Sequence, residues 1–270
     1  MRSLFMSALA FASLAAAGSA EAKTLCTLVS DAATGRVLLE EGDCRTRVTP
    51  ASTFKVPLAV MGFDSGFLKD AHTPTLPYKA GDVDWGGAAW RQPTDPTRWL
   101  KYSVVWYSQR ITHALGAKAL AEAAQRFGYG NADFSGDPGR DNGLDRAWIA
   151  SSLKVSPQEQ VAFLGKLVTG RLPASDHAMS ETGKIVESVA AGDGWVVHGK
   201  TGTAYPRTPD GGFNRARAYG WYVGWAEKGG RVVVFARLTQ DEEVDKVPAG
   251  PRVRADLMKA WPALAAALPE

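Results

Sequence analysis

The stretch TPASTFKVPLAVMGF, residues 49–63, places a serine and a lysine at the head of a long apolar run. Ser52 and Lys55 are three residues apart, and the pattern predicts a helix over about 50–64. Residues three apart on a helix lie on one face, so the two side chains should meet. Desolvation disfavours the charged form of a lysine at the edge of a core. A neutral Lys55, or an acceptor made from it, could then take the proton of the Ser52 hydroxyl, as in an activated nucleophile.

The start of this helix and a second copy of the motif bear on that interpretation. Pro50 suits a first helical turn, and Thr49 before it is the expected cap. A second Ser-x-x-Lys spacing occurs at Ser151 and Lys154. It precedes a capping box that opens at Ser156, so we expect this copy in extended or coiled chain, where the two side chains need not meet. We interpret the second copy as a chance match.

Upstream of the motif, residues 25–41 form two short alternating runs around a turn, which predicts a β-hairpin. The two cysteines of the chain, Cys26 and Cys44, would meet near the open end of this hairpin. An even pair of cysteines in an exported chain favours a disulfide, which is worth about 3 kcal/mol of stability. Two free thiols are the alternative. No Cys/His spacing indicates a metal site.

Downstream of the motif, the pattern changes from helical to strand-like. Helical patterns dominate the middle of the chain, after a loop-rich segment at 70–100. The last third contains three strand patterns, GWVVHGKTGTAY, AYGWYVGWAE and RVVVFARL, and then an Ala/Leu-rich helix. The predicted fold class is therefore α/β in the α+β sense, an antiparallel sheet flanked by helices with an inserted all-helical lobe. The expected helices lie at about 103–113, 116–127, 156–168, 176–190 and 249–267.

These patterns predict one folded domain at 23–270. A mixed sheet lobe should cover about 23–64 and 190–270, and a helical lobe should cover about 65–189. Long insertions of this kind keep one hydrophobic core as long as the chain stays within the usual size of a domain.

Residues 1–22 have the composition of a secretory signal peptide, with Arg2, an apolar stretch, and Ala20-Glu21-Ala22 as a small-residue cleavage site. The apolar part is short for a membrane span, and no later run is long enough for one. We therefore expect a periplasmic protein with no membrane attachment after cleavage; an uncleaved anchor is the alternative. The net charge of +3, with Lys and Arg scattered, gives no electrostatic reason to expect a nucleic-acid partner.

Two further motifs accompany the Ser52 motif. Ser103-Val104-Val105 lies at the start of an expected helix, and Lys200-Thr201-Gly202 lies inside an expected strand. In this order, the three motifs resemble those of the serine enzymes that react with penicillin. The second motif is followed by Trp106, and Tyr129-Gly130-Asn131 comes later. With these additions the chain is closely similar to the class D β-lactamases, the oxacillinases, over roughly residues 24–262.

Membership of this family would explain the buried lysine. Phe54, Val105, Trp148 and Leu153 are the expected walls of an apolar pocket around Lys55, which would lower the lysine pKa. The resemblance implies that Lys55 is carried as an N-carboxylate, so that a carboxylate base stands beside the nucleophile. It implies no cofactor and no metal, apart from the carbon dioxide consumed in this reversible modification.

The resemblance also implies roles for the other motif residues. Ser52 would attack the lactam carbonyl, and the backbone N–H groups of Ser52 and Thr203 would form the oxyanion hole. Ser103 would relay a proton to the departing lactam nitrogen, with Lys200 supplying positive charge. The indole of Trp148 would donate a hydrogen bond to the modified lysine and hold it in place.

The resemblance assigns the substrate carboxylate to Thr201, Gly202 and an arginine near the C-terminus. At this last point the chain departs from the family, because Gly250 occupies the usual arginine position. Arg252 and Arg254 lie close by, and we choose Arg252 as the carboxylate-binding residue.

The expected activity is hydrolysis of a small-molecule β-lactam. One alternative is the β-lactam-binding sensor domain of antibiotic-responsive receptors, which is acylated without turnover. Another is a cell-wall D,D-peptidase of the same superfamily. Ser-Val-Val in place of Ser-x-Asn, together with Trp148, favours the β-lactamase, and the sequence leaves the oligomeric state open.

Overall fold

The computed structural model describes residues 22–269, so the predicted signal peptide, apart from Ala22, lies outside the described residues. The strands are β1 (Lys23–Asp31), β2 (Val37–Gly42), β3 (Ser188–Ala190), β4 (Val196–Ala204), β5 (Tyr219–Lys228) and β6 (Arg231–Gln240). The α-helices are α1 (Lys55–Asp64), α2 (Pro96–Tyr102), α3 (Val105–Leu115), α4 (Ala117–Phe127), α5 (Gly143–Arg146), α6 (Pro157–Val168), α7 (Asp176–Ile185) and α8 (Ala249–Ala267). Short 3-10 helices are η1 (Ala51–Phe54), η2 (Gly87–Ala89) and η3 (Arg215–Arg217).

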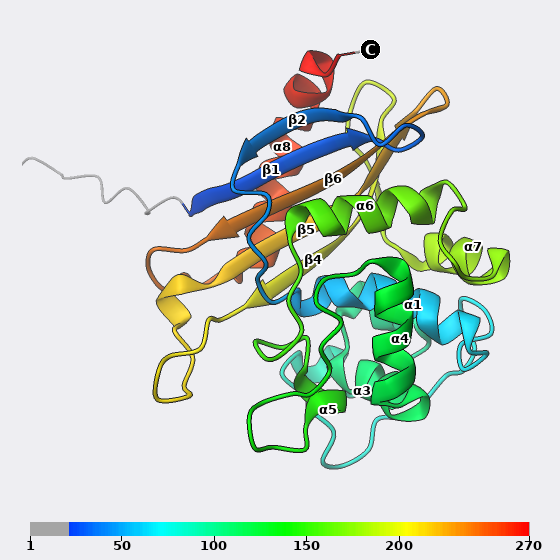
Figure 1. The fold of residues 1–270 in the computed structure, drawn as a ribbon, viewed down its shortest axis with the longest axis vertical. Helices are drawn as coiled ribbons and strands as arrows, with labels where there is room; N and C mark the ends of the chain where they lie inside the picture. The colour runs from blue at the N-terminus through cyan, green and yellow to red at the C-terminus, as the bar shows by residue number, and fades with distance from the viewer. Residues whose placement is uncertain (1–21, 270) are drawn as a thin grey trace, which may run out of the picture.

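The strands form one antiparallel sheet in the order β2-β1-β6-β5-β4-β3, which confirms the predicted fold class. Helix α8 lies along one face of the sheet, and α6 crosses the other face (Figure 1). The shorter helices gather beyond α6 as a helical lobe, and α1 lies at the centre of that lobe (Figure 1). Strand β4 contacts the η1 turn that leads into α1, so the sheet meets the helical lobe along this strand.

Two separate cores hold the layers together. On one face, Val253, Leu257 and Trp261 of α8 pack against Val197 and Phe235 of the sheet. The core on the other face joins the sheet, α6 and the helical lobe. Burial of apolar surface on both faces fixes the sheet between its helical layers.

The N-terminal hairpin forms as predicted. Strands β1 and β2 pair antiparallel, and Cys26 and Cys44 form a disulfide with their Cα atoms 5.1 Å apart. Both cysteines are buried. The two cysteines are 18 residues apart in sequence, and the bridge between them closes the open end of the hairpin.

This disulfide gives a testable expectation of stability. The Cys26→Ala/Cys44→Ala variant should lose about 3 kcal/mol of unfolding free energy, because its unfolded chain is no longer cross-linked. Urea denaturation of the two proteins measures the difference. Alkylation of the denatured, unreduced wild type, followed by intact mass measurement, should find no free thiol; two alkylated thiols would refute the bridge.

The predicted strands and helices differ from the structure mainly between the motifs. Helix α7 ends at Ile185 rather than near 190, because the chain turns there into the three-residue strand β3, which pairs with β4. Helix α2 lies at the end of the segment expected to be loop, and Asp95 caps it by accepting a hydrogen bond from the Arg98 N–H. The terminal helix covers 249–267, as predicted.

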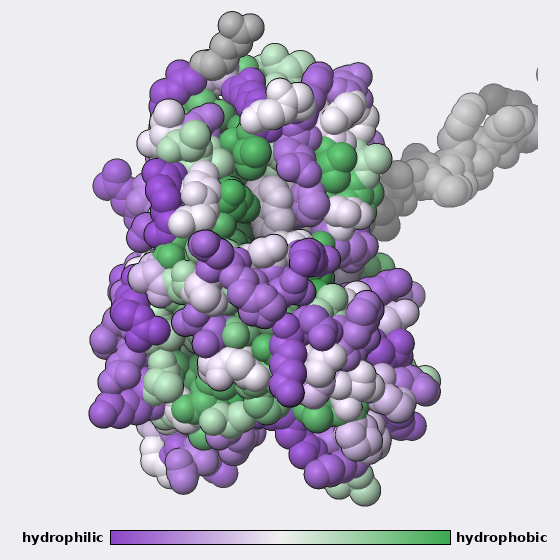
Figure 2. Space-filling view, turned by 90° about the vertical axis from the view of Figure 1, so that its right-hand side faces the viewer, coloured by the Kyte–Doolittle hydropathy of each residue, from purple (hydrophilic) through white to green (hydrophobic). Residues whose placement is uncertain are grey.

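The surface agrees with the scattered charges of the sequence. Hydrophilic side chains cover most of the face drawn in Figure 2, and smaller apolar areas lie between them. Among the described residues, no helix combines the length and the apolar character that crossing a membrane requires.

Candidate active site

Ser52 lies in the 3-10 turn η1, which continues directly into α1. The predicted helix over 50–64 is thus formed in two pieces. Because α1 begins at Lys55, Pro57 occupies its first turn, where a missing N–H removes no helical hydrogen bond. The residue before the serine, Ala51, has a positive φ of 50°, a backbone conformation that is sparsely populated by residues other than glycine.

The capping role predicted for Thr49 is wrong. The η1 turn has no side-chain cap. The Thr49 hydroxyl instead donates to the carbonyl of Trp148 at 2.9 Å and accepts from the N–H of Ala150 at 2.9 Å. Thr49 therefore ties the segment that carries Ser52 to the segment that carries Trp148, which are about a hundred residues apart in sequence.

Lys55 is completely buried, and its Nζ donates a hydrogen bond to Oγ of Ser52 at 3.2 Å. Four residues were predicted to form the walls of its pocket, and all are buried in the core that joins the sheet, α6 and the helical lobe: Phe54, Val105, Trp148 and Leu153. Desolvation, followed by repulsion from Lys200, lowers the pKa of Lys55 well below its usual value. Within the described residues, Lys55 forms no ion pair. The amine of Lys55, which favours its neutral form, therefore lies next to the hydroxyl of Ser52.

Lys200 approaches the same place from strand β4. It is 6% exposed, and its Nζ donates to the carbonyl of Thr201 at 3.1 Å. Desolvation lowers the pKa of Lys200 to about 8; Arg254 also lowers it, whereas Glu187 partly restores it. The Lys200 ammonium therefore gives up its proton more readily than an ordinary lysine.

Gly202 explains how closely β4 approaches the turn that carries Ser52. A Cβ at this position would lie 3.0 Å from the Pro50 carbonyl oxygen and 3.3 Å from Cβ of Ala51. A Cβ at these distances would be tighter than an ordinary contact, so glycine allows the strand to pack this closely against the η1 turn. The glycine of the strand motif therefore brings Lys200, Thr201 and Ser52 together.

Ser103 lies between α2 and α3 rather than at the start of a helix. It ends α2 in the left-handed conformation, with a φ of 58°. Its hydroxyl oxygen is buried and has no hydrogen-bond partner within the described part of the chain. A buried polar atom without a partner costs free energy, so its presence beside a cleft is typical of a functional site.

A cleft of about 380 Å³ lies beside Ser52, Ser103 and Gly202. The structure brings six of the predicted residues to its lining: Ser52, Ser103, Val105, Thr201, Gly202 and Thr203. Lys55 and Lys200 are not part of this lining; Lys55 reaches it through its hydrogen bond to Ser52. Sequence reasoning missed the other residues of the lining: Ala51, Trp85, Gly86, Trp90, Tyr102, Ile149, Tyr205, Pro248 and Pro251. Two loops beside the motifs, near 85–100 and 205–218, contain four of them: Trp85, Gly86, Trp90 and Tyr205.

The structure does not bring Arg252 to this cleft. Its guanidinium forms ion pairs with Asp241 at 2.5 Å and Asp245 at 3.5 Å. Gly250 takes the place next to β4, and a Cβ there would lie 2.8 Å from the Gly202 carbonyl oxygen. A larger residue at 250 would push α8 away from the strand.

The remaining residues singled out in the sequence have structural roles. Ser151, in the second Ser-x-x-Lys copy, donates its hydroxyl proton to a carboxylate oxygen of Asp137 at 2.7 Å, and the segment is not helical, as expected. Glu159 completes the capping box of α6 and also forms an ion pair with Arg47. Among the described residues, no group of His, Cys, Asp and Glu side chains could hold a metal ion.

Comparison with known proteins agrees with this geometry. Residues 25–260 match the family model described as the penicillin binding protein transpeptidase domain. Beta-lactamase OXA-9 of Klebsiella pneumoniae is 42% identical over 252 residues, which is 93% of this chain and 92% of that protein. Beta-lactamase OXA-1 of Escherichia coli is 34% identical, over 79% of this chain and 75% of that protein.

The crystal structure of the OXA-427 class D beta-lactamase superposes with a TM-score of 0.82 at 47% identity, covering 89% of this chain and 98% of that one. The fold, the three motifs and these relatives place the chain in the penicillin-binding transpeptidase family and, within it, among the class D serine β-lactamases.

Proposed function

We propose that this enzyme hydrolyses the cyclic amide of penicillin-type β-lactams through an acyl-enzyme on Ser52. One observation carries the proposal: the Nζ atom of a fully buried lysine lies 3.2 Å from the Ser52 hydroxyl. A serine hydroxyl needs a neighbouring base to act as a nucleophile, and Lys55 is the ionisable group bonded to it. The relatives named as β-lactamases support the same reaction.

The base in this proposal is an N-carboxylated Lys55. The neutral amine attacks carbon dioxide, a carbon–nitrogen bond forms, and a proton leaves the nitrogen. The side chain then ends in a carboxylate, whose oxygens accept protons where the ammonium could only donate them. Burial supports this modification because it lowers the lysine pKa and so keeps the attacking amine neutral. Carbon dioxide is the one co-reactant that the proposal requires.

Acylation would then run in a defined order. The carboxylated Lys55 takes the proton of Ser52, and Oγ attacks the lactam carbonyl carbon. The backbone N–H groups of Ser52 and Thr203 stabilise the oxyanion that develops on the carbonyl oxygen. The carbon–nitrogen bond of the ring breaks, and Ser103 relays a proton to the departing nitrogen. The Ser103 hydroxyl, buried and without a partner among the described residues, supports this role because it is free to bond to the substrate.

Deacylation would use the same base. The carboxylated Lys55 takes a proton from water, whose oxygen attacks the ester carbonyl carbon. The bond between that carbon and Oγ of Ser52 then breaks, and the base returns the proton to Oγ. Trp148 donates a hydrogen bond to the carbamate and excludes other water from the pocket. Its burial and its contact with Phe54, whose ring centre lies 5.6 Å away, support the second part of this role.

The substrate carboxylate would bind at the β4 side of the cleft. Thr201 and Gly202 line the cleft there. Lys200, whose Nζ is bonded to the Thr201 carbonyl, would supply the positive charge. Arg252, the arginine chosen from the sequence, would first have to leave its ion pair with Asp241. We therefore propose that the Lys200-Thr201-Gly202 motif binds the substrate carboxylate. Arg252 instead stabilises α8 through its ion pair with Asp241.

The proposed place of action is the periplasm. The leader-like composition of residues 1–22 and the disulfide between Cys26 and Cys44 both support export to an oxidising compartment.

Hydrolysis of a chromogenic cephalosporin by the purified enzyme tests the proposed function. We expect many turnovers per enzyme molecule, with a linear steady state. A single burst of colour equal to the enzyme concentration, followed by no further reaction, would instead identify a β-lactam sensor that is acylated without turnover. Absence of both would contradict the proposal.

A further inference from the structure

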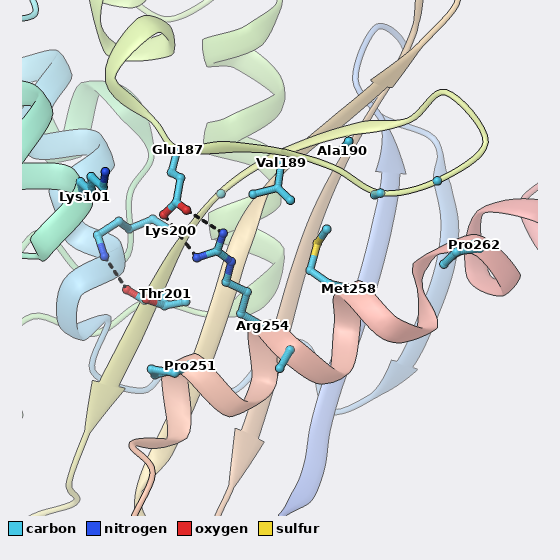
Figure 3. Close-up of a pocket in the computed structure, with 14 residues that line it drawn as sticks. Lys101, Glu187, Val189, Ala190, Lys200, Thr201, Pro251, Arg254, Met258 and Pro262 are labelled. Atoms are coloured by element: carbon cyan, nitrogen blue, oxygen red, sulfur yellow. Dashed lines mark hydrogen bonds and ion pairs between the residues drawn. The ribbon is translucent and has the colours of Figure 1, made fainter.

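A second cavity, of about 800 Å³, opens beside the cleft at the edge of β4 (Figure 3). Thr201 and Pro251 line both hollows, so the two are neighbours across the strand. The rest of the second cavity comes from Lys101, from Gly199 and Lys200 of β4, from the segment around β3 and from one side of α8. Apart from Lys200 and Thr201, the proposed function assigns no role to the residues that line this cavity.

The charges in this cavity are unequal. Its lining contains three cationic side chains, Lys101, Lys200 and Arg254. Within the described part of the chain, Glu187 is the one carboxylate in that lining. One carboxylate is thus shared among several cations, and the structure shows which of them binds it.

Arg254 binds Glu187 with both ends of its guanidinium. Nη2 donates to Oε1 at 2.8 Å and Nη1 donates to Oε2 at 3.3 Å, which is a bidentate pair. Figure 3 shows this pair beside Lys200, whose Nζ turns the other way, toward the carbonyl of Thr201. Lys200 therefore has no carboxylate partner among the described residues, although one lies in the same cavity.

The backbone fixes both members of the pair. The carbonyl of Glu187 accepts a hydrogen bond from the N–H of Gly199 at 3.0 Å, so Glu187 lies next to the residue that precedes Lys200. Arg254 lies one helical turn after Gly250, on the side of α8 that meets β4. Its guanidinium also lies 6.0 Å above the ring centre of Tyr222.

We propose that Arg254 and Glu187 are positioning residues for Lys200, an inference that rests on the proposed function. By binding Glu187, Arg254 keeps this carboxylate from drawing the Lys200 ammonium away from the carbonyl of Thr201. Lys200 then stays at the carbonyl of Thr201, a residue that lines the cleft, and within electrostatic reach of Lys55, where its positive charge serves the reaction.

The proposal predicts opposite effects of the two residues on the titration of Lys200. The charged groups that face Lys200 are Lys55 from α1, Lys101 from α2, Glu187 before β3 and Arg254 from α8. Loss of Arg254 removes a repulsive cation and frees Glu187, so the pKa of Lys200 should rise. Loss of Glu187 removes the attractive charge, so the pKa of Lys200 should fall. Each shift should be roughly 0.5 to 1 unit from the wild-type value of about 8.

The test is a carbon-13 NMR titration of enzyme labelled at lysine Cε, with the Lys200 signal assigned by its loss in Lys200→Gln. We expect an upward shift in Arg254→Gln and a downward shift in Glu187→Gln. In the double variant the upward shift should disappear, because the freed carboxylate is gone. Arg254→Lys should return part of the wild-type value. Shifts of the same sign, or none, would overturn the proposal.

Kinetics supply the second readout. In Arg254→Gln, kcat/KM should fall about tenfold, because Lys200 turns toward Glu187. The alkaline limb of the pH profile of kcat/KM should also move to higher pH. In Glu187→Gln the alkaline limb should move to lower pH. Lys118→Gln and Glu122→Gln, from an exposed ion pair on α4, make the same charge changes and should leave the limb in place.

The two proposals fail separately. The NMR titration is made without substrate, so it would stand even if Ser52 proved not to react with β-lactams. Conversely, a wild-type enzyme that turns over β-lactams while both variants keep its pH profile and its Lys200 titration would overturn the positioning role alone.

Discussion

Replacing Ser52 with alanine is expected to abolish β-lactam hydrolysis, with a loss of about 10⁴-fold or more in kcat. The loss is this large because no covalent intermediate can form without the hydroxyl, and Lys55 then has no proton to take. The folded state should survive, because Ser52 is only partly buried and its hydroxyl is bonded to Lys55. Initial rates with a chromogenic cephalosporin, and intact mass after brief exposure to penicillin, measure the two losses.

The matched control is Ser151→Ala, in the second Ser-x-x-Lys copy. Its hydroxyl bonds to Asp137 and lies outside the cleft lining, so the rate should stay close to that of the wild type. A penicillin adduct on any residue other than Ser52, located by peptide mapping of the wild type, would contradict the assignment of the nucleophile.

The second large effect concerns carbon dioxide and Lys55. If the base is a carbamate, thorough removal of dissolved carbon dioxide should lower activity by about 10²-fold or more, and bicarbonate should restore it at fixed pH. Activity should also fall on the acid side, because protonation of the carbamate releases carbon dioxide and the amine then takes a proton. The lowered pKa of Lys55 moves this loss to a lower pH than an ordinary lysine would show, because burial keeps the free amine neutral over a wider range.

Trp148→Ala distinguishes the carbamate from an unmodified amine. The variant should need more bicarbonate for full activity, because the carbamate loses a donor and water enters the pocket. Deacylation should slow more than acylation, so acyl-enzyme should accumulate in the mass spectrum. A fully active enzyme in carbon-dioxide-free buffer, with a carbon-13 spectrum that shows no carbamate, would refute this mechanism and leave Ser52 as the nucleophile.

The placement of the candidate site residues could be predicted from sequence because it depends mainly on neighbouring residues. A serine and a lysine three apart must share a helical face, and a Lys-Thr-Gly inside a strand pattern must lie on a sheet. The sheet, the disulfide hairpin and the terminal helix also follow from periodicity and from the cysteine pair. These features depend on short-range rules that the rest of the fold does not override.

The predictions that the structure did not support depend on how distant segments of the chain pack against one another. Helix α8 was predicted with the correct limits, yet the choice of Arg252 was not supported by its position, because the face that meets β4 is set by the close approach at Gly250. The hydroxyl of Thr49 has a partner about a hundred residues away, which outweighs its local preference for a cap. Strand β3 is too short to show a period of its own.

The order of the strands has a consequence for how the chain matures. Strand β1 at the start pairs with β6 near the end, and Lys23 lies opposite Gln240. During synthesis the first hairpin must therefore wait, with one edge unpaired, until nearly the whole chain has emerged. Contacts between such distant residues make folding slow, and an open strand edge invites wrong pairing. A chain that ended before Arg231 would lack β6, the partner of β1, so the sheet can close only after β6 has been synthesised.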